Sequence, residues 1–213
     1  MPRPRDFHMN PQAVVHVYNR GVDRRKLFHR PRDYEICLEM FADAKEKTNV
    51  SILVHTLMPT HFHWVLQQHE PFGIANFMQR ACFAFSRWSN KRSNRAGPLF
   101  EGPYGGKEIR EPDGLLRVTH YIIRNPIHAG LARTMGSWKY CSILSPLVNS
   151  NGSLDDPSLL LALVGGPEKY IKFLEEFDGG DPESVERFLC PEAARIWVEA
   201  MAKRPHTTRR SRR

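Results

Sequence analysis

Residues 50–67, VSILVHTLMPTHFHWVLQ, contain two runs rich in β-branched and aromatic residues with a short break at Pro59. Such runs favour β-strands, and a connection this short joins antiparallel neighbours. We therefore expect a hairpin whose first strand covers Val50–Leu57 and whose second covers His61–Gln67. This hairpin decides the fold, because the elements on both sides of it can be placed relative to its strands.

Outward from the hairpin, strand and helix patterns alternate. Apolar residues recur at helical spacing in residues 31–48 and again in residues 72–90. The expected order is a strand over 13–19, a helix over 31–48, the hairpin, a helix over 72–90, a strand over 107–110 and a helix over 112–124, which Pro126 should end. This order predicts an α+β fold: a ferredoxin-like antiparallel sheet with helices on one face, plus one added helix.

Four segments organise the chain. Residues 1–12 are a polar N-terminal arm, and residues 13–148 carry the elements above. After a polar stretch, residues 149–202 are expected to form a small helical appendage that starts its first helix near Pro157. Residues 203–213 are a basic tail that we expect to be disordered.

The formal charge of +8 favours an anionic partner, but it is unevenly distributed. Removing six basic residues near the C-terminus leaves +8 − 6 = +2 for residues 1–202. The six are Lys203, Arg204, Arg209, Arg210, Arg212 and Arg213. Charge alone therefore fits nucleic acid, acidic lipid or simple solubility equally well.

Cysteine spacing and hydropathy argue against three classes of protein. The four cysteines form no Cys-x-x-Cys pair, which argues against a disulfide framework and against a structural zinc site; they are Cys37, Cys82, Cys141 and Cys190. No apolar run approaches the roughly 20 residues that span a bilayer. We expect a cytoplasmic protein without a membrane partner.

His61 and His63 are two residues apart in a predicted strand, so both rings should project from one face while Phe62 and Trp64 point to the other. Neutral imidazoles are common metal ligands, and with one oxygen donor the pair would leave coordination sites open on Mg²⁺, Mn²⁺ or a related ion. The pattern alone also fits two half-exposed strand histidines that bind nothing.

Tyr121 and Asn125 lie four residues apart in the helix predicted over 112–124 and just beyond it, and therefore share a face. Arg117 and Arg124 lie on or near that face. A protonated phenol is a poor nucleophile, so a nucleophilic tyrosine needs an ion and cations around its phosphate target. The alternative is a tyrosine at the edge of the core.

Two basic clusters could neutralise phosphates. The first follows the first strand, and the second ends the helix over 72–90; their members are Arg20, Arg24, Arg25 and Lys26, and Arg87, Lys91, Arg92 and Arg95. Three nearby aromatic residues could stack on unpaired bases: Tyr18, Phe28 and Trp88. A solvated surface is the alternative for each cluster, and core packing is the alternative for Trp88.

Three motifs occur in order and at characteristic spacing: residues 58–64 (MPTHFHW), 121–126 (YIIRNP) and 128–131 (HAGL). Together they resemble the single-strand-specific tyrosine transposases of the His-hydrophobic-His endonuclease superfamily, and most closely the REP-associated tyrosine transposases of bacteria. The resemblance covers residues 13–148. Thr60 stands where relatives usually have Asn, Pro103 where Arg is common, and Gly105-Gly106 where basic or polar residues are common.

The resemblance implies that residues 13–148 are a catalytic domain in which His61, His63 and Asn125 bind Mg²⁺ or Mn²⁺ and Tyr121 attacks DNA. The partner would be single-stranded DNA containing hairpins, joined through its 5′ phosphate to the tyrosine, with no nucleotide cofactor. Relatives with a C-terminal extension suggest a monomer rather than a dimer. Two other readings stay open: a DNA-binding module that no longer cleaves, and a structural zinc protein.

Overall fold

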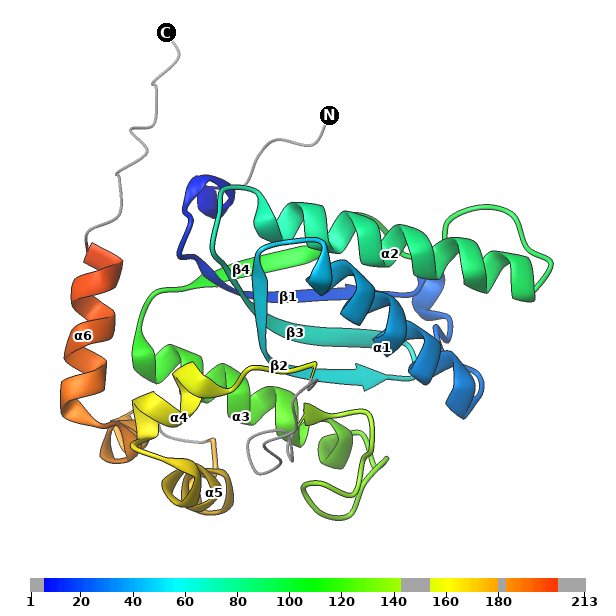
Figure 1. Ribbon diagram of the computed structural model, residues 1–213. Coiled ribbons are helices and arrows are strands. Elements are labelled where there is room, and N and C mark those ends of the chain that lie inside the picture. The colour runs from blue at the N-terminus through cyan, green and yellow to red at the C-terminus, as the bar shows by residue number, and fades with distance from the viewer. Residues whose placement is uncertain (1–5, 143–153, 180–182, 203–213) are drawn as a thin grey trace, which may run out of the picture.

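A four-stranded antiparallel sheet is the centre of the protein, whose computed structural model describes residues 6–142, 154–179 and 183–202 (Figure 1). The strands are β1 (Val14–Arg20), β2 (Val50–Met58), β3 (His61–Gln68) and β4 (Gly105–Ile109), in the spatial order β2-β3-β1-β4. Helix α1 (Pro31–Glu46) connects β1 to β2, and α2 (Gly73–Arg92) connects β3 to β4. The α+β class and the ferredoxin-like topology are confirmed.

Each face of the sheet has its own core. Helices α1 and α2 lie side by side over one face (Figure 1), where Phe41 of α1 stacks on Trp64 of β3 with ring centroids 4.4 Å apart. Helix α3 (Pro112–His128) covers the opposite face, where Ile122 packs in one cluster with Val65 of β3. The expectation of helices on one face thus describes α1 and α2, whereas the added helix lies opposite them.

Helix α3 continues beyond the point where Pro126 was expected to end it, so that prediction was wrong. Pro126 lies in the last turn, where its missing N–H removes one hydrogen bond of the helix and leaves the rest intact. Its carbonyl oxygen accepts from the backbone N–H groups of Leu131 (2.8 Å) and Ala132 (3.2 Å), which close the helix instead.

The C-terminal segment is helical, as predicted, and packs on α3. It contains α4 (Ser158–Val164), α5 (Pro167–Glu176), a 3-10 helix over Glu183–Phe188 and α6 (Pro191–Ala202). Phe177, which follows α5, contacts His120 of α3, and the Trp197 indole of α6 donates to the Arg110 carbonyl oxygen (2.8 Å). The expected boundary at residues 148–149 and the basic tail lie outside the described residues. No helix in the described ranges has the length and apolar character needed to cross a bilayer.

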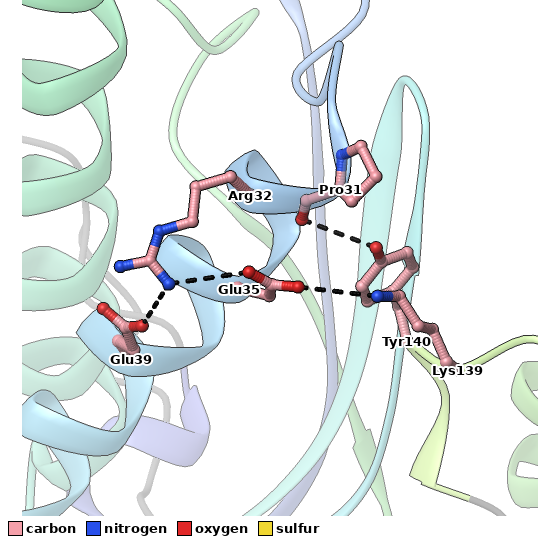
Figure 2. A network of polar contacts seen from close by, with 6 residues as sticks. All are labelled: Pro31, Arg32, Glu35, Glu39, Lys139 and Tyr140. Atoms are coloured by element: carbon pink, nitrogen blue, oxygen red, sulfur yellow. Dashed lines mark hydrogen bonds and ion pairs between the residues drawn. The ribbon is translucent and has the colours of Figure 1, made fainter.

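The chain after α3 returns to cover β2, which is an edge strand. The Leu57 N–H donates to the Tyr140 carbonyl oxygen (2.9 Å), so this segment occupies the open edge of the sheet. Figure 2 shows how it is held on α1: the Tyr140 hydroxyl donates to the Pro31 carbonyl oxygen (3.4 Å), and Lys139 lies 3.4 Å from Glu35. A covered edge cannot pair with a further strand.

Candidate active site

Alternation along β3 places the predicted histidine pair on the α3 side of the sheet. Phe62 and Trp64 are fully buried beneath α1 and α2, as expected from the period of two. His61 and His63 point the other way, and their ring centroids lie 5.1 Å apart. The hairpin therefore supplies core contacts on one face and two imidazoles on the other.

A third histidine, which the sequence patterns did not single out, belongs to this group. β1 pairs antiparallel with β3 in a register that sets His16 opposite Val65 and Tyr18 opposite His63, so His16 is the diagonal neighbour of His63 on the same face. The His16 Nε2 lies 2.9 Å from the His63 Nδ1, so one of the two nitrogens donates and the other accepts. The rings stack with centroids 5.1 Å apart. Only the strand register reveals this contact.

The electrostatic surroundings keep these imidazoles neutral. Burial, with His16 and His61 nearby, lowers the pKa of His63 to about 3. Burial and Lys107 lower the pKa of His16 to about 4, and burial and Arg20 lower the pKa of His61. Neutral imidazole is the form that coordinates a metal ion.

The hydrogen bonds also decide which nitrogens are available to a ligand. His61 Nδ1 lies 3.1 Å from the Thr60 hydroxyl, and His63 Nδ1 is engaged by His16. Within the described part of the chain, the Nε2 atom of each ring in the pair has no hydrogen-bond partner. An imidazole whose second nitrogen is held in this way has a fixed orientation, which is the usual arrangement of a metal-binding histidine.

Tyr121 comes to the site from α3. The helix buries Leu115 and Ile122 against the sheet, and Tyr121 faces the histidines with 47% of its surface exposed. Its ring lies edge-on to His63, with centroids 5.6 Å apart, and 6.4 Å from the ring of His16. The predicted tyrosine and histidine pair are therefore neighbours, although 58 residues separate His63 from Tyr121 in the sequence.

Asn125 lies one turn beyond Tyr121 on α3 and is half-buried. Mg²⁺ and Mn²⁺ can bind an amide oxygen together with imidazole nitrogens. The predicted set of His61, His63 and Asn125 is therefore chemically suited to such an ion. Among the described residues, no group of three or more His, Cys, Asp and Glu side chains could hold a metal.

The site opens into a cavity of about 590 Å³. Its walls include Tyr18, Arg20, Arg24, His61, His63 and Tyr121, whereas Asn125 is not among the wall residues. The loop before β4 closes one side with Glu101, Gly102 and Pro103. The cavity is large enough for a nucleotide and combines an apolar wall with cations.

Tyr18 gives the cavity an aromatic wall, and Gly105 permits its position. Tyr18 is 46% exposed, with its ring centroid 6.1 Å from that of His63. A Cβ atom at Gly105 would lie 2.3 Å from the Tyr18 ring, so a larger residue there would force the ring to move. The glycine that departs from the pattern of the resembling family thus accommodates a flat aromatic surface.

The first predicted basic cluster is divided by the structure. Arg20 and Arg24 line the cavity, and Arg20 forms an ion pair with Glu101. Arg25 lies 3.5 Å from Asp23 and points to solvent, where Lys26 is also exposed. Two members of the cluster are therefore at the site and two are outside its wall.

The other predicted cations are not at the cavity. Arg87 and Lys91 lie on α2, across the sheet from Tyr121. Arg117 pairs with Asp113 at 2.8 Å. Arg124 has a buried Nε without a hydrogen-bond partner among the described residues.

Two of the three predicted base-stacking residues belong to the core instead. Phe28 is buried and stacks on Tyr34, with centroids 4.3 Å apart, so its predicted exposure was wrong. Its position after a basic cluster did not reveal that it packs under α1. Trp88 packs on Phe85, which agrees with the alternative of core packing. Of these three residues, Tyr18 is the one that has an exposed ring at the site.

The chain is similar to known transposases in sequence and in fold. The family model described as "Transposase IS200 like" matches residues 10–125, more than half of the chain. A solved REP-associated tyrosine transposase bound to a REP hairpin is 14% identical, with a TM-score of 0.58, and the match covers 73% of this chain and 91% of that one. A Deinococcus radiodurans protein described as a transposase is 15% identical, with a TM-score of 0.40, covering 57% and 95% of the two chains. No curated protein sequence matches.

Proposed function

The chain belongs to the family of IS200-like transposases, and from that membership we propose that it nicks and rejoins single-stranded DNA with Tyr121 as the nucleophile. The proposed ion is Mg²⁺ or Mn²⁺, held by His61, His63 and Asn125. One observation carries the proposal: the Tyr121 ring lies edge-on to His63 at 5.6 Å, in the same cavity as both histidines. This geometry supports Tyr121 as a nucleophile that acts beside two oriented imidazoles.

In the proposed reaction, the Tyr121 hydroxyl oxygen attacks the phosphorus of a phosphodiester. The bond between phosphorus and the 3′ oxygen breaks, the phenol loses its proton, and the leaving 3′ oxygen gains one. DNA then remains joined to Tyr121 through its 5′ phosphate. A 3′ hydroxyl that attacks this phosphotyrosine rejoins the strand and releases the tyrosine. Because the intermediate retains a phosphodiester, no nucleotide cofactor is needed.

Besides Tyr121, four residues of the cavity have a role in this scheme. Fixed orientation of His61 and His63 keeps the ligand nitrogens in place, and the bound ion would neutralise charge on the attacked phosphate. Arg24 adds positive charge to the cavity wall, and the ring of Tyr18 provides a surface on which an unpaired base can stack. These features support single-stranded rather than duplex DNA as the substrate.

Hairpin-containing DNA is the proposed substrate class. The solved relative with the same fold is bound to a REP hairpin, which supports a hairpin beside the cleaved strand here as well. We also propose that the chain acts as a monomer, because α4, α5 and α6 cover α3 and the segment around Tyr140 covers the edge of β2. Sedimentation of the full chain should give one chain per particle, and a stable dimer would contradict this.

A covalent-adduct assay tests the nucleophile. The full chain is incubated with labelled hairpin DNA and Mn²⁺ and resolved on a denaturing gel. We expect an adduct with the wild type, none with Tyr121→Phe, and none after chelation of the metal. Tyr18→Phe is the matched control, because Tyr18 is the other exposed tyrosine of the cavity, and it should still form the adduct.

Two outcomes would overturn the proposal. An adduct that persists in Tyr121→Phe and disappears in Tyr18→Phe would show that the nucleophile is Tyr18 of β1 and not Tyr121 of α3. Absence of any adduct over a broad set of hairpins would favour a DNA-binding module that retains the fold without cleavage.

A further inference from the structure

The solvent face of α2 carries a row of residues that the proposed reaction does not use. Arg80, Phe83, Arg87 and Lys91 are exposed and follow one another at intervals of three, four and four residues, so they form one stripe along the helix. We call these four residues the α2 stripe. At 1.5 Å per residue it is about 16 Å long, which spans several nucleotides. It lies across the sheet from Tyr121.

The cations of the α2 stripe have no acidic partners. The 20 residues of α2 contain neither Asp nor Glu. Among the residues that the structure describes, no carboxylate pairs with any of the three cations. The neighbouring helix α1 differs, because its Arg32 lies 3.5 Å from Glu35 and 2.9 Å from Glu39 (Figure 2). Arg92 at the end of α2 does pair with Asp33 (3.2 Å), but it lies outside the stripe. A merely solvated helix face resembles α1, so the unpaired cations of the α2 stripe indicate an anionic partner.

Phe83 stands in the middle of these cations. Its exposed fraction of 61% is the largest of any large apolar side chain in the described residues. It forms a wall of two cavities, of about 510 and 570 Å³, on its two sides, and the Arg87 guanidinium lies 5.6 Å from the ring centroid. An exposed aromatic ring between cations is the arrangement that binds single-stranded nucleic acid, with a base stacked on the ring and phosphates on the cations.

We propose that the α2 stripe is a second contact surface for single-stranded DNA, in which Phe83 stacks on an unpaired base and Arg80, Arg87 and Lys91 bind phosphates. The inference takes its ligand from the proposed function but concerns a different face of the sheet. The chain itself links the two faces. After α2 it reaches the end of β1, where the Glu101 N–H donates to the Arg20 carbonyl oxygen (3.0 Å), and there it forms a wall of the cavity that contains Tyr121.

Binding of a fluorescent oligothymidylate to the full chain tests the stacking contact. Fluorescence anisotropy is measured with a chelator present, so that no cleavage occurs, and a matched duplex serves as the second ligand. Phe83→Ala should weaken binding of the single strand about five- to hundredfold, because base stacking contributes about 1–3 kcal/mol. Binding of the duplex should not change, and Phe83→Trp should restore the single-strand affinity. Ile196→Ala, an equally exposed apolar position on α6, should have no effect.

The salt dependence of the same binding tests the phosphate contacts. Arg87→Gln and Lys91→Gln should each lower the slope of log affinity against log salt by about 0.7, the value expected for one phosphate of a single strand. Arg32→Gln removes the same charge from α1, where carboxylates hold it, and should leave the slope unchanged.

Unchanged oligothymidylate affinity in Phe83→Ala, or an equal loss for the duplex, would overturn the inference. The adduct at Tyr121 is measured separately. A wild-type adduct combined with unaffected Phe83→Ala binding would remove this surface and keep the proposed function. Weaker single-strand binding in Phe83→Ala, combined with no wild-type adduct, would keep this surface and remove the proposed function.

Discussion

The two faces of β3 differ in what they contribute, although their residues alternate in one strand. Phe62 and Trp64 are fully buried in an aromatic core with α1 and α2. His61 and His63, their immediate neighbours, face a cavity and keep one nitrogen each without a hydrogen bond among the described residues. Because side chains alternate between the two faces of a strand, one residue can pack in the core while its neighbour lines the site.

The difference between the faces extends to the elements above them. On the α1 side, the aromatic rings interlock, as in the pair of Phe41 and Trp64. On the α3 side, Tyr121 stays half exposed above the histidines, while other residues of α3 pack on the sheet and on the C-terminal helices. Substitution of the aromatic rings on the first face should therefore lower stability, whereas cleavage should depend on a few side chains of the second.

The largest expected effect is on the histidine face. His63→Ala should abolish formation of the covalent DNA adduct, because it removes a proposed ion ligand beside Tyr121. The free energy of unfolding should fall by only about 1 kcal/mol, the contribution of one hydrogen bond, here the one with His16. Adduct gels and urea unfolding measure the two quantities. A variant that still forms the adduct at the wild-type rate would show that this face is not the catalytic one.

The adjacent position should behave in the opposite way. Phe62→Ala should lower the free energy of unfolding by about 3–5 kcal/mol, because it leaves a cavity beneath α1 and α2. At temperatures where the variant is folded, adduct formation should continue. Equal losses of stability in Phe62→Ala and His63→Ala would contradict the separation of roles along β3.

Features of the fold and the site that depend on residues close together in the sequence could be predicted, whereas contacts between residues far apart could not. The histidine face and the position of Tyr121 on a helix followed from local periods of two and of 3.6 residues. His16 could not be assigned to the site, because its contact depends on the register between β1 and β3. The burial of Phe28 beside Tyr34 likewise depends on tertiary packing that no local pattern contains. Pro126 misled the prediction because its effect on a helix depends on how close the helix already is to its end.

An intermediate effect is expected at His16, which acts on the site through His63. His16→Leu should lower Mn²⁺ affinity and the rate of adduct formation about 10- to 100-fold, the usual cost of losing a group that orients a metal ligand. His16→Gln retains a hydrogen-bonding group at this position and should recover most of the loss. Calorimetric titration with Mn²⁺ measures the affinity. Identical behaviour of the two variants would mean that His16 only fills space.

The smallest effect is expected at His120, a buried histidine of α3 that does not line the cavity. It lies against Phe177, and burial lowers its pKa to about 4; Arg124 and His128 act in the same direction, while the Phe177 backbone and Asp178 oppose it. In the unfolded chain this histidine has its ordinary pKa of about 6.5. Between about pH 4 and 6.5 the unfolded chain therefore binds a proton that the folded chain does not.

The free energy of unfolding should therefore rise with pH between about 4 and 6.5 through His120 and should not depend on it above that range. His120→Leu should lower the slope in this range without removing it, because the lowered pKa values of His16 and His63 contribute to the same range. Urea unfolding at a series of pH values measures the slope, and an unchanged slope in His120→Leu would assign the dependence to the other histidines. A smaller slope with unchanged adduct formation at neutral pH would show that this buried histidine outside the cavity affects stability alone, in contrast to His63.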